Sequence, residues 1–221
     1  MTMTGTKAII ERCQSLFEDL QFTAAREWKA AKAGRKVIGY MPIYVPREII
    51  HAADMLPLGI LGGGDQLEVI HGDAYYQSYI CRIPRSTIEL GVSGRLDFVD
   101  GMMFPSICDV IRNLSGMWKM MFPDVYVRYF DVPQNYADDI GGSYYAGELT
   151  ELRDHLGELR GSPITDRGGN SCRRGQWRCG LDRWALNRRG INRCGFAVAE
   201  KPPRRRRADH TRSDGDQRHR R

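Results

Sequence analysis

Short apolar runs alternate four times with segments of helical periodicity between residues 36 and 160. The apolar runs occupy residues 36–40, 58–61, 98–104 and 125–130. Helices are expected over residues 7–33, 47–55, 84–90 and 107–121, and around Leu149, Leu152, Leu156 and Leu159. Short strands that are apolar on both faces are typical of a parallel sheet with helices on each side. The sequence therefore predicts an α/β lobe of three layers with a parallel sheet of about four strands.

Sheets of this class bind ligands where strands give way to helices, at the carboxyl ends of the strands. In this chain those places are the loops near residues 41–46, 62–82, 105–109 and 131–143. Functional side chains are expected in these four loops.

The last quarter of the chain differs in composition from the rest. Residues 167–221 carry 17 Lys and Arg against 5 Asp and Glu, whereas residues 1–166 carry 16 against 22. Only 5 of these last 55 residues are Leu, Ile, Val or Phe, far below the roughly 20% under which a charged segment stays unfolded. We expect one α/β domain over residues 1–166, followed by a disordered, arginine-rich basic tail over residues 167–221.

A change of reading frame explains the tail best. Its cations are 16 arginines and one lysine, whereas residues 1–166 have 11 and five, and GC-rich codons read out of frame favour arginine and glycine over lysine. We expect the tail to be a frameshift product that begins near Asp166. The alternative is a genuine basic extension that binds nucleic acid.

No run of 18 apolar residues occurs, so the sequence predicts no membrane-spanning segment. The N-terminus becomes charged at Lys7 and Glu11 and lacks the apolar core of a signal peptide. We expect a cytoplasmic protein, in which the six cysteines are thiols or metal ligands more often than disulfides.

Cys108 is the first candidate site residue, because it directly follows the third apolar run. Ser106 and Asp109 have the spacing of a capping box, which would make Ser106 the N-cap and place Cys108 in the first helical turn. A helix N-terminus favours a thiolate, the form that binds iron. The alternative is a small apolar residue buried in the core.

Cys81 is the second candidate, three residues before Pro84, which suits the first turn of a helix. Arg82 and Arg85 add positive charge that favours a thiolate. Alone, Cys81 reads more readily as a packed loop residue. Together with Cys108 it predicts a metal site, because both residues fall on one edge of the sheet.

Other motifs carry less chemistry. Gly62-Gly63-Gly64 lacks the spacing of a phosphate-binding loop and reads as a turn, and without a Walker motif ATP hydrolysis by this chain is not expected. His51 and His71 are interpreted as structural or surface residues, and Tyr75, Tyr76 and Tyr79 as packing residues. Cys172, Cys179 and Cys194 in the tail do not have the spacing of a metal site.

Two long segments carry a resemblance to a known family. Residues 39–54 (GYMPIYVPREIIHAAD) and 104–114 (FPSICDVIRNL) are similar to the benzoyl-CoA reductase / 2-hydroxyacyl-CoA dehydratase family. Residues 129–136 (YFDVPQNY) favour the reductase branch. The resemblance covers roughly residues 5–166.

The resemblance implies flavodoxin-like lobes and a [4Fe–4S] cluster held by three cysteines. Cys81 and Cys108 match the first two ligand positions, and the third ligand belongs to a later part of the fold that this chain lacks. The catalytic proton donors stay unassigned. The family continues into a second lobe, where this chain turns arginine-rich.

The resemblance also implies a reaction and partners. The expected reaction is the ATP-dependent reduction of the benzoyl-CoA ring to a cyclic diene thioester in anaerobic aromatic degradation. Electrons come from ferredoxin, and ATP is used by two ATPase subunits beside one homologous cluster subunit. The alternatives are a 2-hydroxyacyl-CoA dehydratase subunit, a nucleic-acid-binding protein and a non-catalytic assembly fragment. In its truncated form the chain alone is expected to be inactive.

Overall fold

The computed structural model describes residues 5–164, which all lie in one compact unit. Its centre is a four-stranded sheet in the order β2-β1-β3-β4. The strands are β1 (Val37–Tyr40), β2 (Leu56–Gly59), β3 (Gly101–Pro105) and β4 (Tyr126–Phe130). Every neighbouring pair is parallel. The predicted parallel α/β sheet is confirmed.

The helices follow the strands in the alternation that the sequence predicts. They are α1 (Thr6–Glu18), α2 (Thr23–Ala30), α3 (Arg47–Ala52), α4 (Gly72–Tyr75), α5 (Arg82–Val92), α6 (Asp109–Met121) and α7 (Ser143–Arg160). A 3-10 turn, η1 (Gly64–Gln66), and a π-helical turn, η2 (Asp138–Gly142), lie in the loops after β2 and β4.

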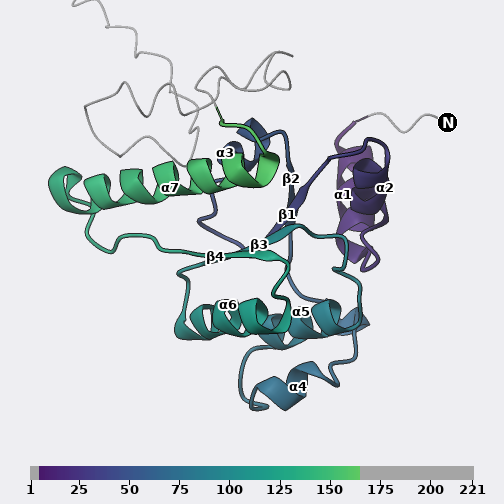
Figure 1. Ribbon diagram of the computed structural model, residues 1–221. Helices are drawn as coiled ribbons and strands as arrows, with labels where there is room; N and C mark the ends of the chain where they lie inside the picture. Colours follow the sequence, from purple (N-terminus) through teal and green to yellow (C-terminus); the bar gives the residue numbers. More distant parts are fainter. Residues whose placement is uncertain (1–4, 165–221) are drawn as a thin grey trace, which may run out of the picture. The chain divides into compact units, whose positions relative to one another are not determined.

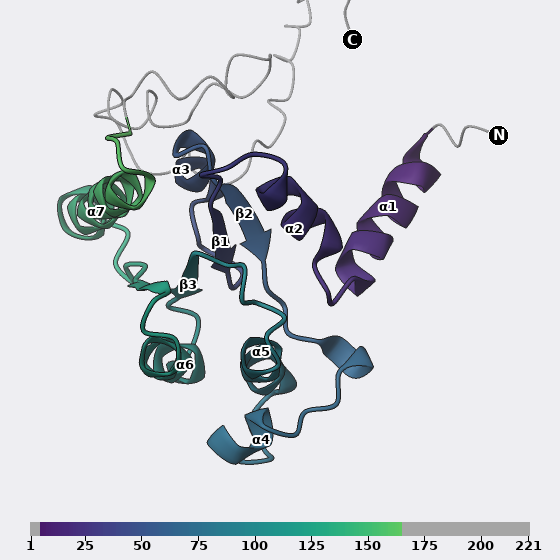
Figure 2. The same cartoon turned by 45° about the vertical axis from the view of Figure 1, so that its right-hand side comes forward.

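Alternation along the strands divides the core into two apolar clusters, one on each face of the sheet. Val37, Met102 and Phe104 lie in the cluster with Ile88 of α5 and Leu114 of α6. Ile38, Met103 and Phe130 lie in the other, with Ile50 of α3 and Leu152 of α7. Figures 1 and 2 show α5 and α6 side by side on one face, with α3 and α7 on the other. The lobe therefore has the three layers predicted.

The strand order creates a switch point between β1 and β3. From β1 the chain crosses by α3 to β2 on one side, and then returns by α5 to β3 on the other side. The order β2-β1-β3-β4 matches the first four strands of a flavodoxin-like sheet. Ligands of such sheets bind beyond the carboxyl ends of the strands at this point.

The helix predicted over residues 7–33 is wrong in one respect, because it is broken into α1 and α2. Phe22 adopts a left-handed conformation with φ of 54°. The carboxylate of Asp19 accepts hydrogen bonds from the backbone N–H groups of Gln21 (3.0 Å) and Thr23 (2.7 Å). A side chain that caps the backbone in this way competes with helix continuation.

Other expected boundaries also differ: the third strand covers residues 101–105 instead of 98–104, and the helices expected over 47–55 and 107–121 cover 47–52 and 109–121. The second strand covers residues 56–59 instead of 58–61, and α5 extends over 82–92 instead of 84–90. The arginine-rich tail over residues 167–221 lies outside the described residues. No helix within residues 5–164 is long and apolar enough to cross a membrane.

Candidate functional site

Cys108 is the N-cap residue of α6, with extended backbone angles (φ −160°, ψ 167°). Its carbonyl accepts hydrogen bonds from the N–H groups of Ile111 (3.1 Å) and Arg112 (3.2 Å), which starts the helix. The prediction that Ser106 caps this helix is wrong. The Ser106 hydroxyl instead accepts the N–H of Val132 at 2.8 Å and joins the loops after β3 and β4. The loop after β4, and not helix α6, therefore takes that oxygen.

Cys81 is likewise an N-cap, of helix α5. The helix begins at Arg82 and not at Pro84, so Cys81 stands at the helix end itself. Both cysteines are exposed. Each thiol is therefore accessible at a helix N-terminus, where unpaired N–H groups favour negative charge.

The topology brings the two cysteines to the same edge of the sheet. Cys108 follows β3, whose carboxyl end borders the switch point. α5 leads into β3, so it runs against the strand direction, and its beginning lies at the carboxyl edge. α5 also contacts α6 along one face of the sheet, as Figure 2 shows.

Tyr76 is the side chain that interacts with both cysteines. Burial raises the pKa of its phenol, and the negative charges of the Cys108 thiolate and then the Cys81 thiolate raise the pKa further. Its hydroxyl donates a hydrogen bond to the carbonyl of Val110 in the first turn of α6, at 3.1 Å. Sequence reasoning interpreted Tyr76 as a packing residue, and it missed the hydrogen bond to α6.

The loop that carries Tyr76 and Cys81 is held to α5 by three polar side chains of that helix. The buried carboxylate of Glu89 accepts the N–H groups of Ile70 (2.9 Å), His71 (2.7 Å) and Gly72 (3.0 Å). Arg82 donates to the carbonyls of Gly64 and Leu67, and Arg85 pairs with Asp73 at 2.6 Å. Both guanidinium groups bind the loop, and the expectation that their positive charge favours a thiolate at Cys81 stays a prediction.

The glycine run forms the turn that the sequence predicts. Gly62 has a positive φ of 77°, and the N–H of Gly63 donates to the hydroxyl of Ser86 on α5 at 3.1 Å. That N–H is therefore engaged within the protein and is not directed at a phosphate.

Exposed apolar side chains occur in all four loops at the carboxyl edge, and we call them the apolar rim. Its members and their exposed fractions are Ile43 (70%), Tyr44 (51%), Leu61 (42%), Tyr79 (80%), Ile107 (45%) and Tyr136 (69%). Exposed apolar side chains of this kind, near the two candidate cysteines, are a feature of surfaces that bind a ligand or another protein.

The donors at this edge fit part of an iron–sulfur site. Thiolates are the usual ligands of such clusters, and two accessible thiols stand here. Within residues 5–164 no group of three or more His, Cys, Asp or Glu side chains is placed to hold a metal. Cys13 lies on α1, and Cys172, Cys179 and Cys194 lie outside the described residues. The described lobe therefore has two candidate ligands, fewer than a cluster needs.

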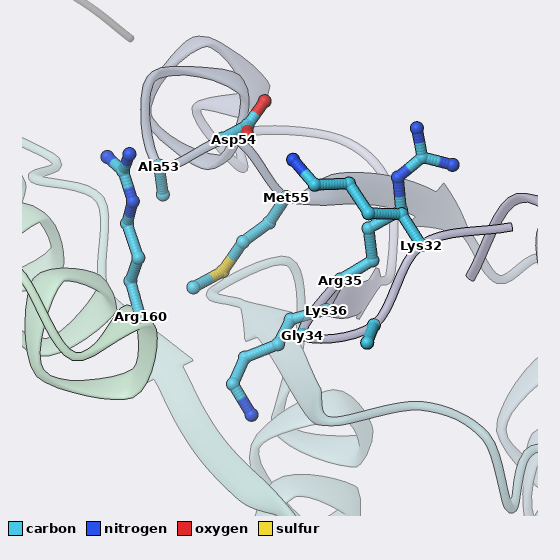
Figure 3. A pocket seen from close by; sticks show the side chains of 9 residues that line it. Lys32, Gly34, Arg35, Lys36, Ala53, Asp54, Met55 and Arg160 are labelled. Atoms are coloured by element: carbon cyan, nitrogen blue, oxygen red, sulfur yellow. The ribbon is translucent and has the colours of Figure 1, made fainter. Parts of the chain in front are cut away.

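A basic pocket of about 80 Å³ lies at the opposite, amino edge of the sheet. Figure 3 shows the cationic side chains around it, and those of Lys36 and Arg160 point in different directions. Lys36 pairs with Asp100 at 3.6 Å, and Arg35 stacks on Trp28 with its guanidinium carbon 4.4 Å from the ring centre. Because these cations do not converge, the pocket is not a built anion site.

The structure is a three-layer α/β lobe with two exposed cysteines at the carboxyl edge of its sheet, and comparison with known proteins defines its class. The family model described as 2-hydroxyglutaryl-CoA dehydratase, D-component, matches residues 42–168. This chain belongs to that family.

Comparison with individual relatives shows which branch of the family this chain resembles more. The chain is 76% identical over 162 residues to the C-type subunit of benzoyl-CoA reductase from Thauera aromatica, covering 73% of this chain and 42% of the relative. It is 32% identical over 163 residues to the beta subunit of (R)-2-hydroxyglutaryl-CoA dehydratase of Acidaminococcus fermentans, covering 72% of this chain and 41% of the relative. The chain thus spans less than half the length of these relatives, and its greater similarity is to the reductase protein.

Proposed function

We propose that residues 1–166 are the first lobe of a benzoyl-CoA reductase subunit of the C type, and that residues 167–221 are a separate segment without a part in the reaction. The identity of 76% to the Thauera aromatica protein supports this choice over a dehydratase, for which the identity is 32%. The proposed activity is reduction of the aromatic ring of benzoyl-CoA by a multi-subunit oxidoreductase.

In this proposal Cys81 and Cys108 are two protein ligands of a [4Fe–4S] cluster. Their exposure, their N-cap positions and their common interaction with Tyr76 support it. When bound, such a cluster supplies electrons of low potential. A third ligand would come from the part of a full-length subunit that has no counterpart here.

The residues of this chain would bind and orient the reacting groups. Cys81 and Cys108, each the N-cap of a helix, would hold the cluster through their sulfurs. The apolar rim would exclude water and offer contact to an aryl thioester. ATP hydrolysis and the docking of ferredoxin belong to other subunits of the proposed assembly.

The test is a hybrid protein in which residues 5–166 replace the matching part of the Thauera aromatica relative, produced with its partner subunits. We expect iron binding and reduction of benzoyl-CoA, and no turnover of a 2-hydroxyacyl-CoA. Cys81→Ala and Cys108→Ala should each lose most of the cluster iron, whereas Cys13→Ala on α1 should retain it. Full iron content and activity after Cys81→Ala and Cys108→Ala would refute the assignment.

A further inference from the structure

The two thiol-bearing helix ends belong to segments that are held in different ways. Cys108 follows β3 directly, so the sheet fixes its position. Cys81 ends a long connection, residues 60–81, that contains only the short elements η1 and α4. Cys81 also caps α5, which packs on the sheet and contacts α6, so bonds from this connection can further fix its separation from Cys108.

The bonds to Glu89, Arg82 and Arg85 hold the connection to α5, the helix that Cys81 itself caps. These bonds order the loop but do not reach α6. The hydroxyl of Tyr76 crosses to α6, because it donates to the carbonyl of Val110, two residues after Cys108. One hydrogen bond of 3.1 Å thus joins the segment of Cys81 to the first turn of the helix of Cys108.

The aromatic ring of Tyr76 is packed as well as bonded. It lies half-buried against the apolar cluster that contains Ile88 of α5 and Ile111 of α6. Its neighbours in sequence differ, since Tyr75 is 47% exposed and Tyr79 is 80% exposed. Tyr76 is therefore held between α5 and α6 by its packing and by its hydrogen bond to Val110.

We propose that Tyr76 is a positioning residue, whose hydrogen bond to α6 sets the separation of the Cys81 and Cys108 thiols. The inference rests on the proposed function, because it takes these two cysteines to act on one bound group. It adds a residue that no cysteine pattern indicates. Tyr76 acts through the two helix ends and need not touch the substrate.

The experiment uses the full chain with Cys13, Cys172, Cys179 and Cys194 changed to serine, so that Cys81 and Cys108 are its only thiols. The probe is dibromobimane, which becomes strongly fluorescent when it alkylates two neighbouring thiols. Iodoacetamide, which alkylates one thiol at a time, reports accessibility separately. The ratio of the two rates measures how well the thiols are placed relative to each other.

We expect Tyr76→Phe to lower this ratio about tenfold, in line with the loss of one hydrogen bond, while the iodoacetamide rate stays the same. Phenylalanine keeps the packing of the ring, so the fold is retained. Tyr75→Phe is the matched control and should leave the ratio unchanged. Amide hydrogen exchange at Ile111 and Arg112, whose N–H groups start α6, should accelerate in Tyr76→Phe alone.

The possible failures are distinguishable. If the parent chain gives no fluorescent product, the two thiols are not neighbours, and the proposed cluster site fails together with the inference. If the parent gives the product and Tyr76→Phe gives it at the same ratio, the cluster site stands and the role of Tyr76 is overturned. If Tyr76→Phe unfolds, amide hydrogen exchange at Ile111 and Arg112 in the parent protein tests the proposal instead. Exchange there as fast as at a frayed helix end would overturn the proposal.

Discussion

Oε1 of Glu89 lies 2.9 Å from Nδ1 of His71, and this contact ties α5 to the loop that leads to Cys81. The Glu89 side chain is only 7% exposed, whereas that of His71 is 67% exposed. The same carboxylate also accepts three backbone N–H groups, from Ile70, His71 and Gly72. A single buried anion therefore organises the start of α4.

Removing the charge of Glu89 should destabilise the lobe. In Glu89→Gln the amide oxygen can still accept the three N–H groups that converge on Oε2, but a neutral acceptor binds them more weakly than a carboxylate, and the NH2 group replaces the oxygen that faces Nδ1 of His71. We expect a loss of about 2 kcal/mol in the free energy of unfolding, the range for hydrogen bonds to a charged group. Urea denaturation measures it. Glu68→Gln, an exposed residue of the same connection, is the control and should change stability little.

The contribution of Glu89 should also depend on pH. Burial alone would raise its pKa, but the hydrogen bonds from the His71 ring and from the N–H groups of Gly72, Ile70 and His71 outweigh it, so the pKa lies below its usual value. A lowered pKa in the folded state gives stability that is present above the unfolded value of about 4.3 and is lost as the pH falls through the folded value.

The stability difference between the parent and Glu89→Gln should therefore be full at pH 7 and shrink below about pH 4. Denaturation at several pH values measures it, and the comparison cancels the other carboxyl groups. A difference that stays constant down to about pH 2.5 would contradict the role assigned to the ionised carboxylate.

Gly91 of α5 lets that helix approach α6 closely. A Cβ atom at this position would lie 2.7 Å from Cη2 of Trp118 and 2.9 Å from Cζ of Phe122. We expect Gly91→Ala to cost about 1–3 kcal/mol through overpacking. Gly116→Ala on α6 is the matched control, because nothing lies within 4 Å of its Cβ, and it should stabilise the helix by about 0.5–1 kcal/mol. Thermal unfolding of both variants checks the opposite signs.

Arg128 of β4 anchors α7 by charge. Its side chain is 11% exposed and pairs with Glu148 at 2.9 Å and with Glu151 at 3.1 Å. Arg128→Met leaves the half-buried Glu148 carboxylate without its cation, so we expect a loss of about 3 kcal/mol. Arg153→Met breaks an ion pair in which Asp154 is 59% exposed, and it should cost under about 1 kcal/mol. Equal losses in the two variants would show that burial of the pair is unimportant.

The sequence by itself determined the number of strands, the alternation of strands and helices, and the edge where the cysteines lie. Apolar periodicity is a local property, and the apolar stripe of α6 at Ile111, Leu114 and Trp118 is buried as predicted. The order strand, loop, helix also placed Cys108 at the carboxyl edge, because parallel strands leave little choice of where a loop emerges.

Only the tertiary structure decided which polar groups pair. Ser106 has the local spacing of a cap, yet its hydroxyl is taken by Val132, 26 residues away. Glu89 lies on an apolar helix with no pattern that predicts its burial, and its partners come from a loop 17 to 19 residues earlier. Tyr76 reaches Val110 across 34 residues. Such bonds form because packing of α5 and α6 on one face of the sheet removes these groups from water, and a sequence pattern does not record which groups then meet.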